Sequence, residues 1–402
     1  MIELNRQQQA VVDAAVKFYK DPHHQTFEFD GEAGTGKSVV LAAIKEALGL
    51  NDAQILPMAY TGQAVSVMKS KGMVEARTCH SGLLECQTGV MHDENGEVIR
   101  LPNGLPKYGM NITPKYIDPD QYKAIFLDEA YMIPRSMKPY IDRTGIKVFA
   151  TGDSGQLPPV KDYPAYLIPN NDHPIYHLTD YMRQDENSPI ISLAKIARNI
   201  KYGMNIPFGC YGDVLVTDRL PSYDYLARAD GIICGTNKTK SYLNRLIRED
   251  ILGFKTGLPQ YGEKMICKMN HWSVESNGIS MTNGLMGYVA KPPEPSNAYK
   301  TYVMSFITQN LDAIFYNLKC DYQFLHADHE EQDYIRSAGF ARTKGEKFDF
   351  AYASTVHSAQ GSEYEAGIFV DDVNPHMDNY RQLVYTAITR FRSKLIYVKT
   401  HA

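Results

Sequence analysis

The sequence predicts an α/β protein with two domains, each built on a parallel β-sheet covered by helices. Three observations predict this fold class: two separate sets of short apolar runs, helical patterns between those runs, and a glycine-rich loop directly after the first run. Buried strands that alternate with helices are typical of parallel sheets with helices on both faces. The length of 402 residues fits this division, because a domain takes about 150 residues on average.

The predicted strands are apolar runs that end in polar or glycine-rich turns. The first set comprises residues 27–29, 55–59, 124–127 and 148–150, and the second comprises residues 232–234, 368–370 and 395–398. Helical patterns cover residues 7–19, 38–48 and 188–199. We therefore expect one α/β domain from each set of strands.

Two stretches interrupt this alternation. Residues 81–115 are rich in glycine and polar residues, and Asn95 with Gly96 favours a two-residue hairpin turn. Glu94 and Glu97 would face each other there, which predicts a solvated tip because like charges repel. Residues 264–347 are β-rich, with turns at residues 277–278 and 283–284. Each stretch is predicted to be an insertion into one α/β domain.

The composition excludes several classes of protein. The formal net charge is −4, so the chain is not a basic coat or histone-like protein, although a motor can confine positive charge to one groove. The six cysteines form no C-x-x-C pair, which argues against a zinc ribbon or iron–sulfur cluster and fits reduced thiols in a cytosol. No stretch approaches the ~20 apolar residues of a membrane span. We expect a cytoplasmic protein with no membrane partner and no secretory signal.

The strongest motif is GEAGTGKS at residues 31–38, which matches G-x-x-x-x-G-K-[ST] between a predicted strand and a predicted helix. Its glycines let backbone N–H groups turn towards a phosphate, and the helix N-terminus adds partial positive charge. Lys37 supplies a charge for the β- and γ-phosphates, and Ser38 supplies a hydroxyl for Mg²⁺. The predicted nucleotide-binding residues are Gly31, Gly34, Thr35, Gly36, Lys37 and Ser38.

Asp128 and Glu129 follow a predicted strand directly. Asp128 at that position can hold Mg²⁺ through water, and Glu129 can orient an attacking water. Acids after a strand are also common helix caps, so the pair gains its meaning from the phosphate-binding loop. Together they predict NTP hydrolysis, with ATP and Mg²⁺ as cofactors.

Such a site needs a cation that arrives from elsewhere in the chain. Arg183 precedes the helix that starts the second domain, and Arg390 lies near the C-terminus. If both reach the nucleotide, the site is a cleft between two domains that ATP closes and hydrolysis opens. The alternative is two surface arginines at helix ends.

The stretch TGDSGQLPPV at residues 151–160 follows another predicted strand. Pro158 and Pro159 limit the backbone freedom behind Gln156. A neutral amide can donate to the γ-phosphate and accept from a neighbour, so Gln156 can register whether that phosphate is present. The alternative is a stiff scaffold loop.

The ordered motifs resemble those of superfamily 1 helicases, and most closely the RecD-like and phage Dda-like branch. They span residues 4–390 and read LNRQQQAVV, GEAGTGKS, ARTCHS, LDEAYM, TGDSGQLPPV, LTDYMRQ, GTNKTKSYLNRLIR, STVHSAQGSEYE and LVYTAITR. The resemblance implies two RecA-like domains, at residues 1–80 with 116–175 and at residues 176–263 with 348–402. It implies a β-hairpin pin at residues 81–115 and an SH3-like insertion at residues 264–347.

The resemblance also implies residue roles. Gln8 matches the residue that reads the adenine edge, and Gly361 and Glu363 match nucleotide-side residues. Gln156 matches the γ-phosphate sensor that links the domains, and Arg183 and Arg390 match two arginine fingers. Contacts to the nucleic-acid strand are implied for Thr61, Thr78, His80, Thr236, Asn237, Thr355 and His357.

Alternatives remain for several of these residues. Thr78 and His80 can be ordinary helix-capping residues, and Asn237 can cap the helix that follows it. Tyr60 stands where the family often has proline, and it can stack on a base or belong to the core. Ser358 replaces a lysine of many relatives, which would remove one phosphate contact.

The implied function is an ATP-dependent DNA helicase and DNA-stimulated ATPase that moves 5′ to 3′ and acts in replication, recombination or repair. Its implied partners are single-stranded DNA and forked duplex DNA, with a single-stranded-DNA-binding or replication protein as a further candidate. We expect a monomer in the cytoplasm, which is the host cytoplasm if a phage encodes the chain. The pin would meet the fork through Met91, His92 or Val98.

Four alternatives to this function are open. One is an RNA helicase of the same superfamily, and another is a RecD-like subunit of a recombination or repair complex. A binding-only scaffold with a dead site is disfavoured by the intact Lys37, Asp128 and Glu129. A single-domain ATPase would lack the motifs between residues 183 and 390.

Overall fold

The structure is a computed structural model of the chain. It describes residues 3–90, 93, 96–100, 104–106, 108–160, 162–169, 175–181, 188–277, 279–296, 300–309, 313–337 and 345–400. The chain divides into two compact units. The first unit comprises Met1–Thr78, Ile117–Gly253 and Tyr352–Ala402, and the second comprises Cys79–Tyr116 and Phe254–Ala351.

The first unit contains two six-stranded sheets, and the N-terminal sheet has the order β3-β2-β6-β7-β1-β8. All neighbouring strands in it are parallel. Its strands are β1 (Thr26–Gly31), β2 (Ile55–Ala59), β3 (Arg77–Thr78), β6 (Ala124–Leu127), β7 (Lys147–Gly152) and β8 (Tyr176–Leu178). The central strands β2 and β6 are buried at every position, as is typical of parallel strands covered on both faces.

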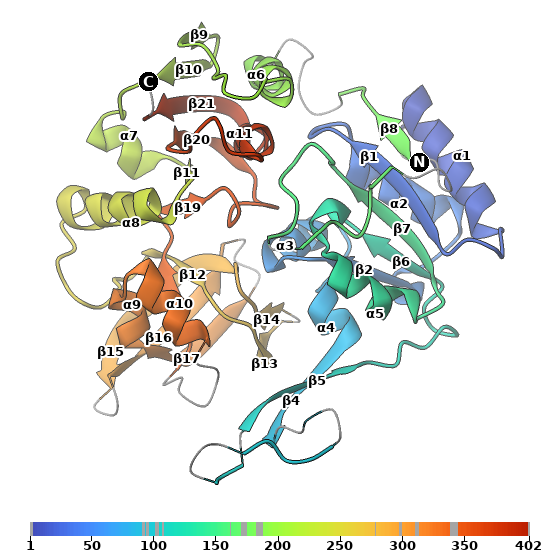
Figure 1. Cartoon of the computed structure of the whole chain (residues 1–402), viewed down its shortest axis with the longest axis horizontal. Coiled ribbons are helices and arrows are strands. Elements are labelled where there is room, and N and C mark those ends of the chain that lie inside the picture. Colours follow the sequence, from blue (N-terminus) through green and yellow to red (C-terminus); the bar gives the residue numbers. More distant parts are fainter. Residues whose placement is uncertain are drawn as a thin grey trace. The chain divides into compact units, whose positions relative to one another are not determined.

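Four helices accompany this sheet: α1 (Arg6–Tyr19), α2 (Lys37–Ala47), α3 (Gly62–Ser70) and α5 (Lys138–Asp142). Asn5 is the N-cap of helix α1: its side chain accepts from the Gln8 N–H, and the Gln8 side chain accepts from the Asn5 N–H. This reciprocal cap satisfies two otherwise unpaired donors of the helix start. Helices α1 and α2 pack together, and Figure 1 shows both beside β1. We call this sheet and its helices, residues 3–78 and 117–181, the N-terminal half.

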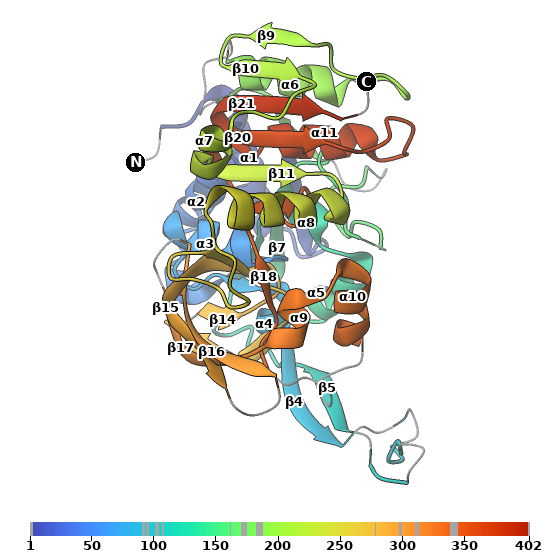
Figure 2. The ribbon, with the colours of Figure 1, turned by 90° about the vertical axis from the view of Figure 1, so that its left-hand side faces the viewer.

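The second sheet has the order β19-β11-β20-β21-β10-β9 and is parallel except for the β9–β10 pair. Figure 2 shows β11, β20, β21, β10 and β9 side by side in this order. Its strands are β9 (Gly209–Tyr211), β10 (Val214–Thr217), β11 (Gly231–Cys234), β19 (Ala353–Thr355), β20 (Tyr364–Asp371) and β21 (Phe391–Lys399). Its helices are α6 (Pro189–Arg198), α7 (Tyr223–Arg228), α8 (Asn237–Arg245), continued by a π-helical turn at Leu246–Ile251, and α11 (Tyr380–Ile388). We call residues 188–253 and 352–400 the C-terminal half.

Alternation along the strands builds a separate core on each face of this second sheet. Ile233 and Phe369 join the cluster that α6 and α11 cover, whereas Ile232 and Ile368 join the cluster that α7 and α8 cover. Successive side chains of a strand point to opposite faces, so neighbouring apolar residues serve both cores. The loops at the carboxyl ends of these strands are thereby held on a rigid support.

The second unit is mostly antiparallel. Strands β4 (Leu84–Val90) and β5 (Tyr108–Pro114) pair as a hairpin preceded by α4 (Cys79–Leu83). A five-stranded sheet has the order β17-β16-β15-β12-β18, and a two-stranded sheet pairs β13 with β14. These elements are β12 (Lys264–Cys267), β13 (His271–Ser276), β14 (Ile279–Met281), β15 (Met286–Ser296), β16 (Thr301–Thr308), β17 (Ile314–Asp321), α9 (Tyr322–His326), α10 (His329–Ser337) and β18 (Phe348–Phe350).

The structure confirms the α/β fold class with two parallel sheets and corrects two details of the prediction. The predicted boundary after residue 175 is wrong, because β8 pairs with β1 and so belongs to the N-terminal sheet. A tight turn does lie at Gly96, where the Asp93 N–H donates to the Glu97 carbonyl. It lies within the connection between β4 and β5, however, and does not join those strands directly. Glu94 and Asn95 lie outside the described residues.

Candidate active site

The phosphate-binding loop connects β1 to α2. Gly36 has a φ of 83° and forms the left-handed N-cap of α2, a conformation that costs little only for glycine. The Lys37 ammonium group lies across the loop and donates to the carbonyls of Gly31 (2.9 Å) and Glu32 (3.2 Å). The loop that would bind a phosphate therefore holds the lysine in place through its own carbonyl groups.

Gln8 supports this loop from behind. Its side chain is buried, and its Nε2 donates to the Thr35 carbonyl at 3.1 Å, while its Oε1 accepts from Asn5 N. Gln8 is absent from the described residues that line the cavity next to the loop. Gln8 therefore helps to position the loop, and its contact with the adenine base stays a prediction.

Asp128 and Glu129 lie at the carboxyl end of β6, opposite the start of α2. Asp128 Oδ2 is 3.5 Å from the Ser38 hydroxyl, and Asp128 Oδ1 accepts from the Glu129 N–H at 2.9 Å. Glu129 has a φ of 50°, a strained conformation for a residue with a side chain. Burial raises the pKa of Glu129, and Arg390 and Lys37 oppose that shift. A raised pKa makes a carboxylate a better proton acceptor near neutral pH.

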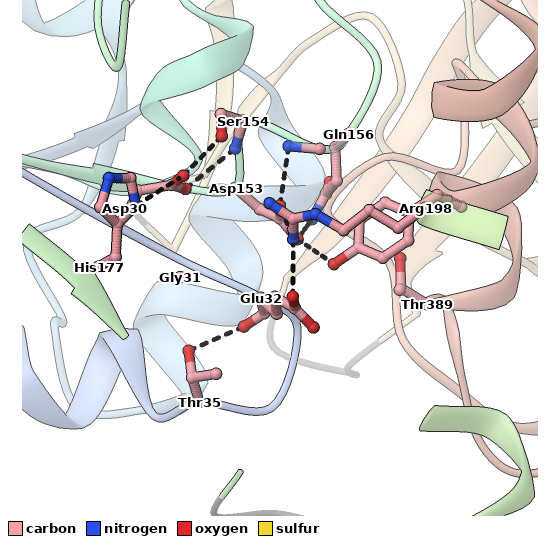
Figure 3. A network of polar contacts seen from close by, with 12 residues as sticks. Asp30, Gly31, Glu32, Thr35, Asp153, Ser154, Gln156, His177, Arg198 and Thr389 are labelled. Carbon is pink, nitrogen blue, oxygen red and sulfur yellow. Dashed lines mark hydrogen bonds and ion pairs between the residues drawn. The ribbon is translucent and has the colours of Figure 1, made fainter. Parts of the chain in front are cut away.

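The Gln156 loop follows β7 and is tied to both halves of the first unit. On the N-terminal side, Asp30 accepts from the Ser154 N–H at 3.0 Å (Figure 3). On the C-terminal side, the Leu157 N–H donates to Thr386 Oγ1 (2.9 Å), and Gln360 Nε2 donates to the Leu157 carbonyl (3.0 Å). The loop predicted to link hydrolysis with movement thus makes hydrogen bonds to both halves.

Gln156 itself is buried, and its Nε2 lies 3.5 Å from Asp153 Oδ2. Its Oε1 is buried and lacks a hydrogen-bond partner within the described part of the chain. A buried polar atom without a partner is uncommon in folded proteins. The Gln156 oxygen lies at the cavity wall, so a polar ligand or a water bound with it could supply the missing hydrogen bond.

Arg390 follows α11 and is held in a fixed position. Its guanidinium donates from Nε to the Thr386 carbonyl (3.1 Å) and from Nη2 to the Thr389 hydroxyl (3.3 Å). Glu363, which directly precedes β20, forms an ion pair with Arg392 of β21. Arg183, the second predicted cation, lies outside the described residues.

These residues line one cavity of about 500 Å³ within the first unit. The predicted residues in its wall are Gly34, Gly36, Lys37, Ser38, Asp128, Glu129, Gln156, Gly361, Glu363 and Arg390. Gly31 and Thr35 are absent from the described wall; the Gly31 carbonyl accepts from Lys37, and the Thr35 carbonyl accepts from Gln8. Apolar side chains of α6, including Ile190 and Ile191, also line it. The structure therefore brings together a phosphate-binding loop, two acids, an amide and an arginine from both halves.

The residues predicted to contact a nucleic-acid strand form a set at each sheet. At the N-terminal sheet, Tyr60 and Thr61 follow β2 and Thr78 ends the adjacent strand β3. At the second sheet, Thr236 and Asn237 follow β11, while Thr355 ends the adjacent strand β19 and His357 follows it. Tyr60 is half-buried and His357 is exposed. His80, which is also half-buried, lies on α4 in the second unit.

Asn237 does not cap helix α8, contrary to the alternative that the sequence left open. Thr236 is the N-cap, accepting from the Thr239 N–H, and Asn237 is the first helical residue. The Thr236 hydroxyl and N–H both donate to Asp372. These donors are already engaged, so a strand contact at Thr236 requires displacement of an acidic partner.

Two residues predicted for the pin tip, Met91 and His92, lie outside the described residues. Val98 is described and exposed. None of the described helices is long and apolar enough to span a membrane. Over the same described part, no cluster of three or more histidine, cysteine or acidic side chains could hold a metal ion.

Sequence reasoning missed Asp153, Arg198 and Tyr385. Asp153 is buried and accepts from the Tyr385 hydroxyl at 2.6 Å, and Arg198 Nη1 lies 3.5 Å from the same carboxylate. Asp153 stands inside the TGDSGQLPPV motif, so that signal was available. Nothing local marks Arg198, because its importance depends on contacts with distant segments.

Two family descriptions match the chain. The family described as "AAA domain" matches residues 3–205, and the "UvrD-like helicase C-terminal domain" matches residues 350–398. The uncharacterized protein R530 of Acanthamoeba polyphaga mimivirus is 24% identical over 335 residues. That match takes in 78% of this chain and only 66% of the length of the viral protein.

Solved structures of Pif1 helicases share the fold. One, described as showing DNA unwinding at forked double-stranded DNA by two coordinating Pif1 helicases, is 18% identical with a TM-score of 0.57, covering 99% of this chain and 92% of its own. Another, a Pif1 helicase from Bacteroides in complex with ADP-AlF3 and single-stranded DNA, is 15% identical with a TM-score of 0.56, covering 100% and 94%. These likenesses establish a common architecture.

Proposed function

The chain belongs to the AAA domain family and has the fold of superfamily 1 helicases of the Pif1- and RecD-like branch, and we propose on this premise that it is an ATP-dependent DNA helicase. The observation that carries the proposal is the cavity in which Lys37 and Glu129 from one half meet Arg390 from the other. Residues from both halves around one nucleotide can convert its hydrolysis into relative movement of the halves.

The chain's own residues divide the chemistry of ATP hydrolysis. Lys37 and the loop N–H groups bind the β- and γ-phosphates. Glu129 orients the water that attacks the γ-phosphorus and accepts its proton, while ADP leaves. Arg390, joined by Arg183 in our proposal, offsets the negative charge that develops on the phosphoryl oxygens.

Ser38 and Asp128 fit a Mg²⁺ ion. Their oxygens approach to 3.5 Å, and Mg²⁺ prefers oxygen ligands, usually one or two protein groups together with the substrate phosphates. When bound, the ion would neutralise charge on the β- and γ-phosphate oxygens. The wall of the cavity would therefore supply both the protein ligands of the ion and the phosphate-binding loop.

DNA binding is proposed for the two sets of strand-end residues. Tyr60, Thr61 and Thr78 would hold the single strand on the N-terminal half, and Thr355 and His357 would hold it on the C-terminal half. Movement of the halves then shifts the grip of each set, with a polarity of 5′ to 3′. The β4–β5 hairpin is proposed as the pin that separates the strands. We also propose that the protein acts as a monomer, because residues from both halves of one chain line the cavity.

Unwinding of tailed forks tests this function. Forked duplexes with only a 5′ tail or only a 3′ tail, made of DNA or of RNA, are mixed with the protein and ATP, and strand separation is measured. We expect unwinding of DNA forks from the 5′ tail and stimulation of ATP hydrolysis by single-stranded DNA. Unwinding only from 3′ tails would refute the polarity, and unwinding only of RNA would support an RNA helicase.

A further inference from the structure

Arg198 is the last residue of α6 and extends from the C-terminal half to two loops of the N-terminal half. Its Nη1 lies 3.2 Å from Glu32 Oε1 and 3.5 Å from Asp153 Oδ1 (Figure 3). Glu32 belongs to the phosphate-binding loop, and Asp153 begins the Gln156 loop. One guanidinium therefore connects both nucleotide-facing loops to the opposite half.

The surroundings of Arg198 fix the plane of its guanidinium. The group lies over the Tyr385 ring, with its central carbon 5.4 Å from the ring centroid. A side chain at Gly155 would place a Cβ 3.1 Å from that carbon, a close contact that would require the guanidinium to shift by a few tenths of an ångström. The guanidinium is thus packed between a loop of the N-terminal half and a helix of the C-terminal half.

Asp153 transmits this contact to Gln156. Its Oδ1 accepts from the Gly155 N–H at 2.9 Å, and its Oδ2 lies 3.5 Å from Gln156 Nε2. The Asp153 side chain has no solvent exposure, so its charge depends on Arg198, the Tyr385 hydroxyl and nearby Lys37. Displacement of Arg198 would leave a buried carboxylate poorly compensated beside the sensor amide.

Glu32 has a different relation to the nucleotide. It is the second residue of the phosphate-binding loop and lines the cavity, where its negative charge would repel the phosphates of ATP. Arg198 and the Tyr181 hydroxyl are its partners. Arg198 Nη1 is buried without a hydrogen bond of good geometry within the described residues, so these ion pairs leave that donor able to take another acceptor.

We infer that Arg198 is a positioning residue that couples nucleotide binding to the Gln156 loop. It neutralises Glu32 beside the phosphates, and it holds Asp153 so that Gln156 faces the cavity. Arrival of the γ-phosphate shifts the guanidinium from its carboxylate partners, and Asp153 carries that shift to Gln156. This inference rests on the proposed ATPase function.

A double-mutant cycle at Arg198 and Glu32 tests the charge relation. The dissociation constant of a fluorescent non-hydrolysable ATP analogue is measured for Arg198→Gln, Glu32→Gln and the double variant. Because Arg198 is partly exposed, we expect Arg198→Gln to weaken binding by about three- to tenfold. Glu32→Gln should strengthen binding by about threefold, and the double variant should return to within about twofold of the wild type. Lys201→Gln, an exposed residue shortly after α6, is the matched control and should bind as the wild type does.

The coupling role is tested by the number of base pairs unwound per ATP hydrolysed. If Arg198 only stabilised the fold, this number and analogue binding would change together. Arg198→Lys keeps the charge but loses the planar fork that reaches two carboxylates. We expect near-normal analogue binding with about threefold fewer base pairs unwound per ATP hydrolysed. The double variant should show the same coupling loss despite its restored affinity, because Asp153 still lacks its partner.

The outcomes separate this inference from the proposed function. Unchanged analogue binding in both Arg198→Gln and Glu32→Gln would refute the charge relation, and wild-type coupling in Arg198→Lys would refute the positioning role. If Arg198→Gln does not fold, as judged by its melting curve, Glu32→Gln and Arg198→Lys still decide both points. A wild-type protein that does not hydrolyse ATP in the presence of single-stranded DNA would instead refute the proposed function.

Discussion

The two halves of the first unit bring different chemistry to the same cavity. The N-terminal half supplies a complete phosphate-binding loop with Lys37, Ser38 and two acids. The C-terminal half supplies Arg390 and the hydroxyl groups of Tyr385 and Thr389, with Arg390 anchored to backbone and hydroxyl oxygens of its own half. Under the proposed function, this difference predicts that the N-terminal half binds the nucleotide, while the C-terminal half acts on its hydrolysis and on the movement that hydrolysis drives.

The largest effect is expected from Lys37→Ala, in the N-terminal half. Loss of the only loop ammonium beside the phosphates should lower ATP turnover by about a thousandfold or more and weaken nucleotide binding. Turnover and analogue binding are measured with single-stranded DNA present. Lys45→Ala, on the same helix and paired with Asp52 on the surface, should behave as the wild type. A Lys37→Ala protein with normal turnover would contradict the site assignment.

Arg390→Ala tests the C-terminal half. We expect turnover to fall about a hundredfold while the dissociation constant of the ATP analogue changes little, because the arginine acts on charge that develops during the reaction. Arg381→Ala, an exposed residue on the helix that precedes Arg390, is the control. An equal loss in binding and turnover would show that Arg390 contributes to nucleotide binding as the N-terminal half does, and not specifically to hydrolysis.

The pH dependence of turnover tests whether Arg390 of the C-terminal half acts on Glu129 of the N-terminal half. Burial raises the pKa of Glu129, and Arg390 lowers it. The deprotonated carboxylate is the active form, so turnover should fall by about tenfold per pH unit once the pH drops below that raised pKa. Removal of the positive charge in Arg390→Gln should raise the pKa further and move this acid limb to higher pH. An acid limb at the same pH in both proteins would show that Arg390 does not act on Glu129.

Gln156→Ala tests the loop between the halves. The variant loses the amide that can contact the γ-phosphate but keeps Lys37 and the acids, so ATP binding should be spared. We expect about tenfold fewer base pairs unwound per ATP hydrolysed, because the loop no longer transmits the loss of the γ-phosphate to the C-terminal half. Unwinding and phosphate release are followed in the same reaction. Unchanged coupling would reduce the loop to a scaffold.

Much of this comparison could be predicted from the sequence, because its signals are local. The phosphate-binding loop is one short motif, and the central strands are continuous apolar runs such as residues 124–127. The short strands β3, β8 and β19 were missed, since a strand of two or three residues exists only through its neighbours. The bond from Gln8 to the Thr35 carbonyl was also not predicted, because it joins residues that only the folded chain brings together.

Arg198 could not be predicted for the same physical reason. Its helix carries the ordinary apolar pattern of a buried face, and an arginine near a helix C-terminus is favoured by the helix dipole alone. Only the folded chain places it between Glu32 and Asp153. Residues that join two halves are recognisable in a sequence when they belong to a motif, as Gln156 does, and otherwise depend on the tertiary contacts.

The smallest expected effect concerns Thr386, which anchors the Gln156 loop from the C-terminal half. Its hydroxyl accepts from the buried Leu157 N–H at 2.9 Å. Thr386→Val keeps the shape but leaves that N–H without its acceptor, which should cost about 1–3 kcal/mol of unfolding free energy. The Gln360 contact to the Leu157 carbonyl remains, so coupling should fall only about twofold, with analogue binding unchanged. Thr386→Ser retains the hydroxyl and should restore coupling, whereas equal coupling in the valine and serine variants would show that the two halves communicate without this bond.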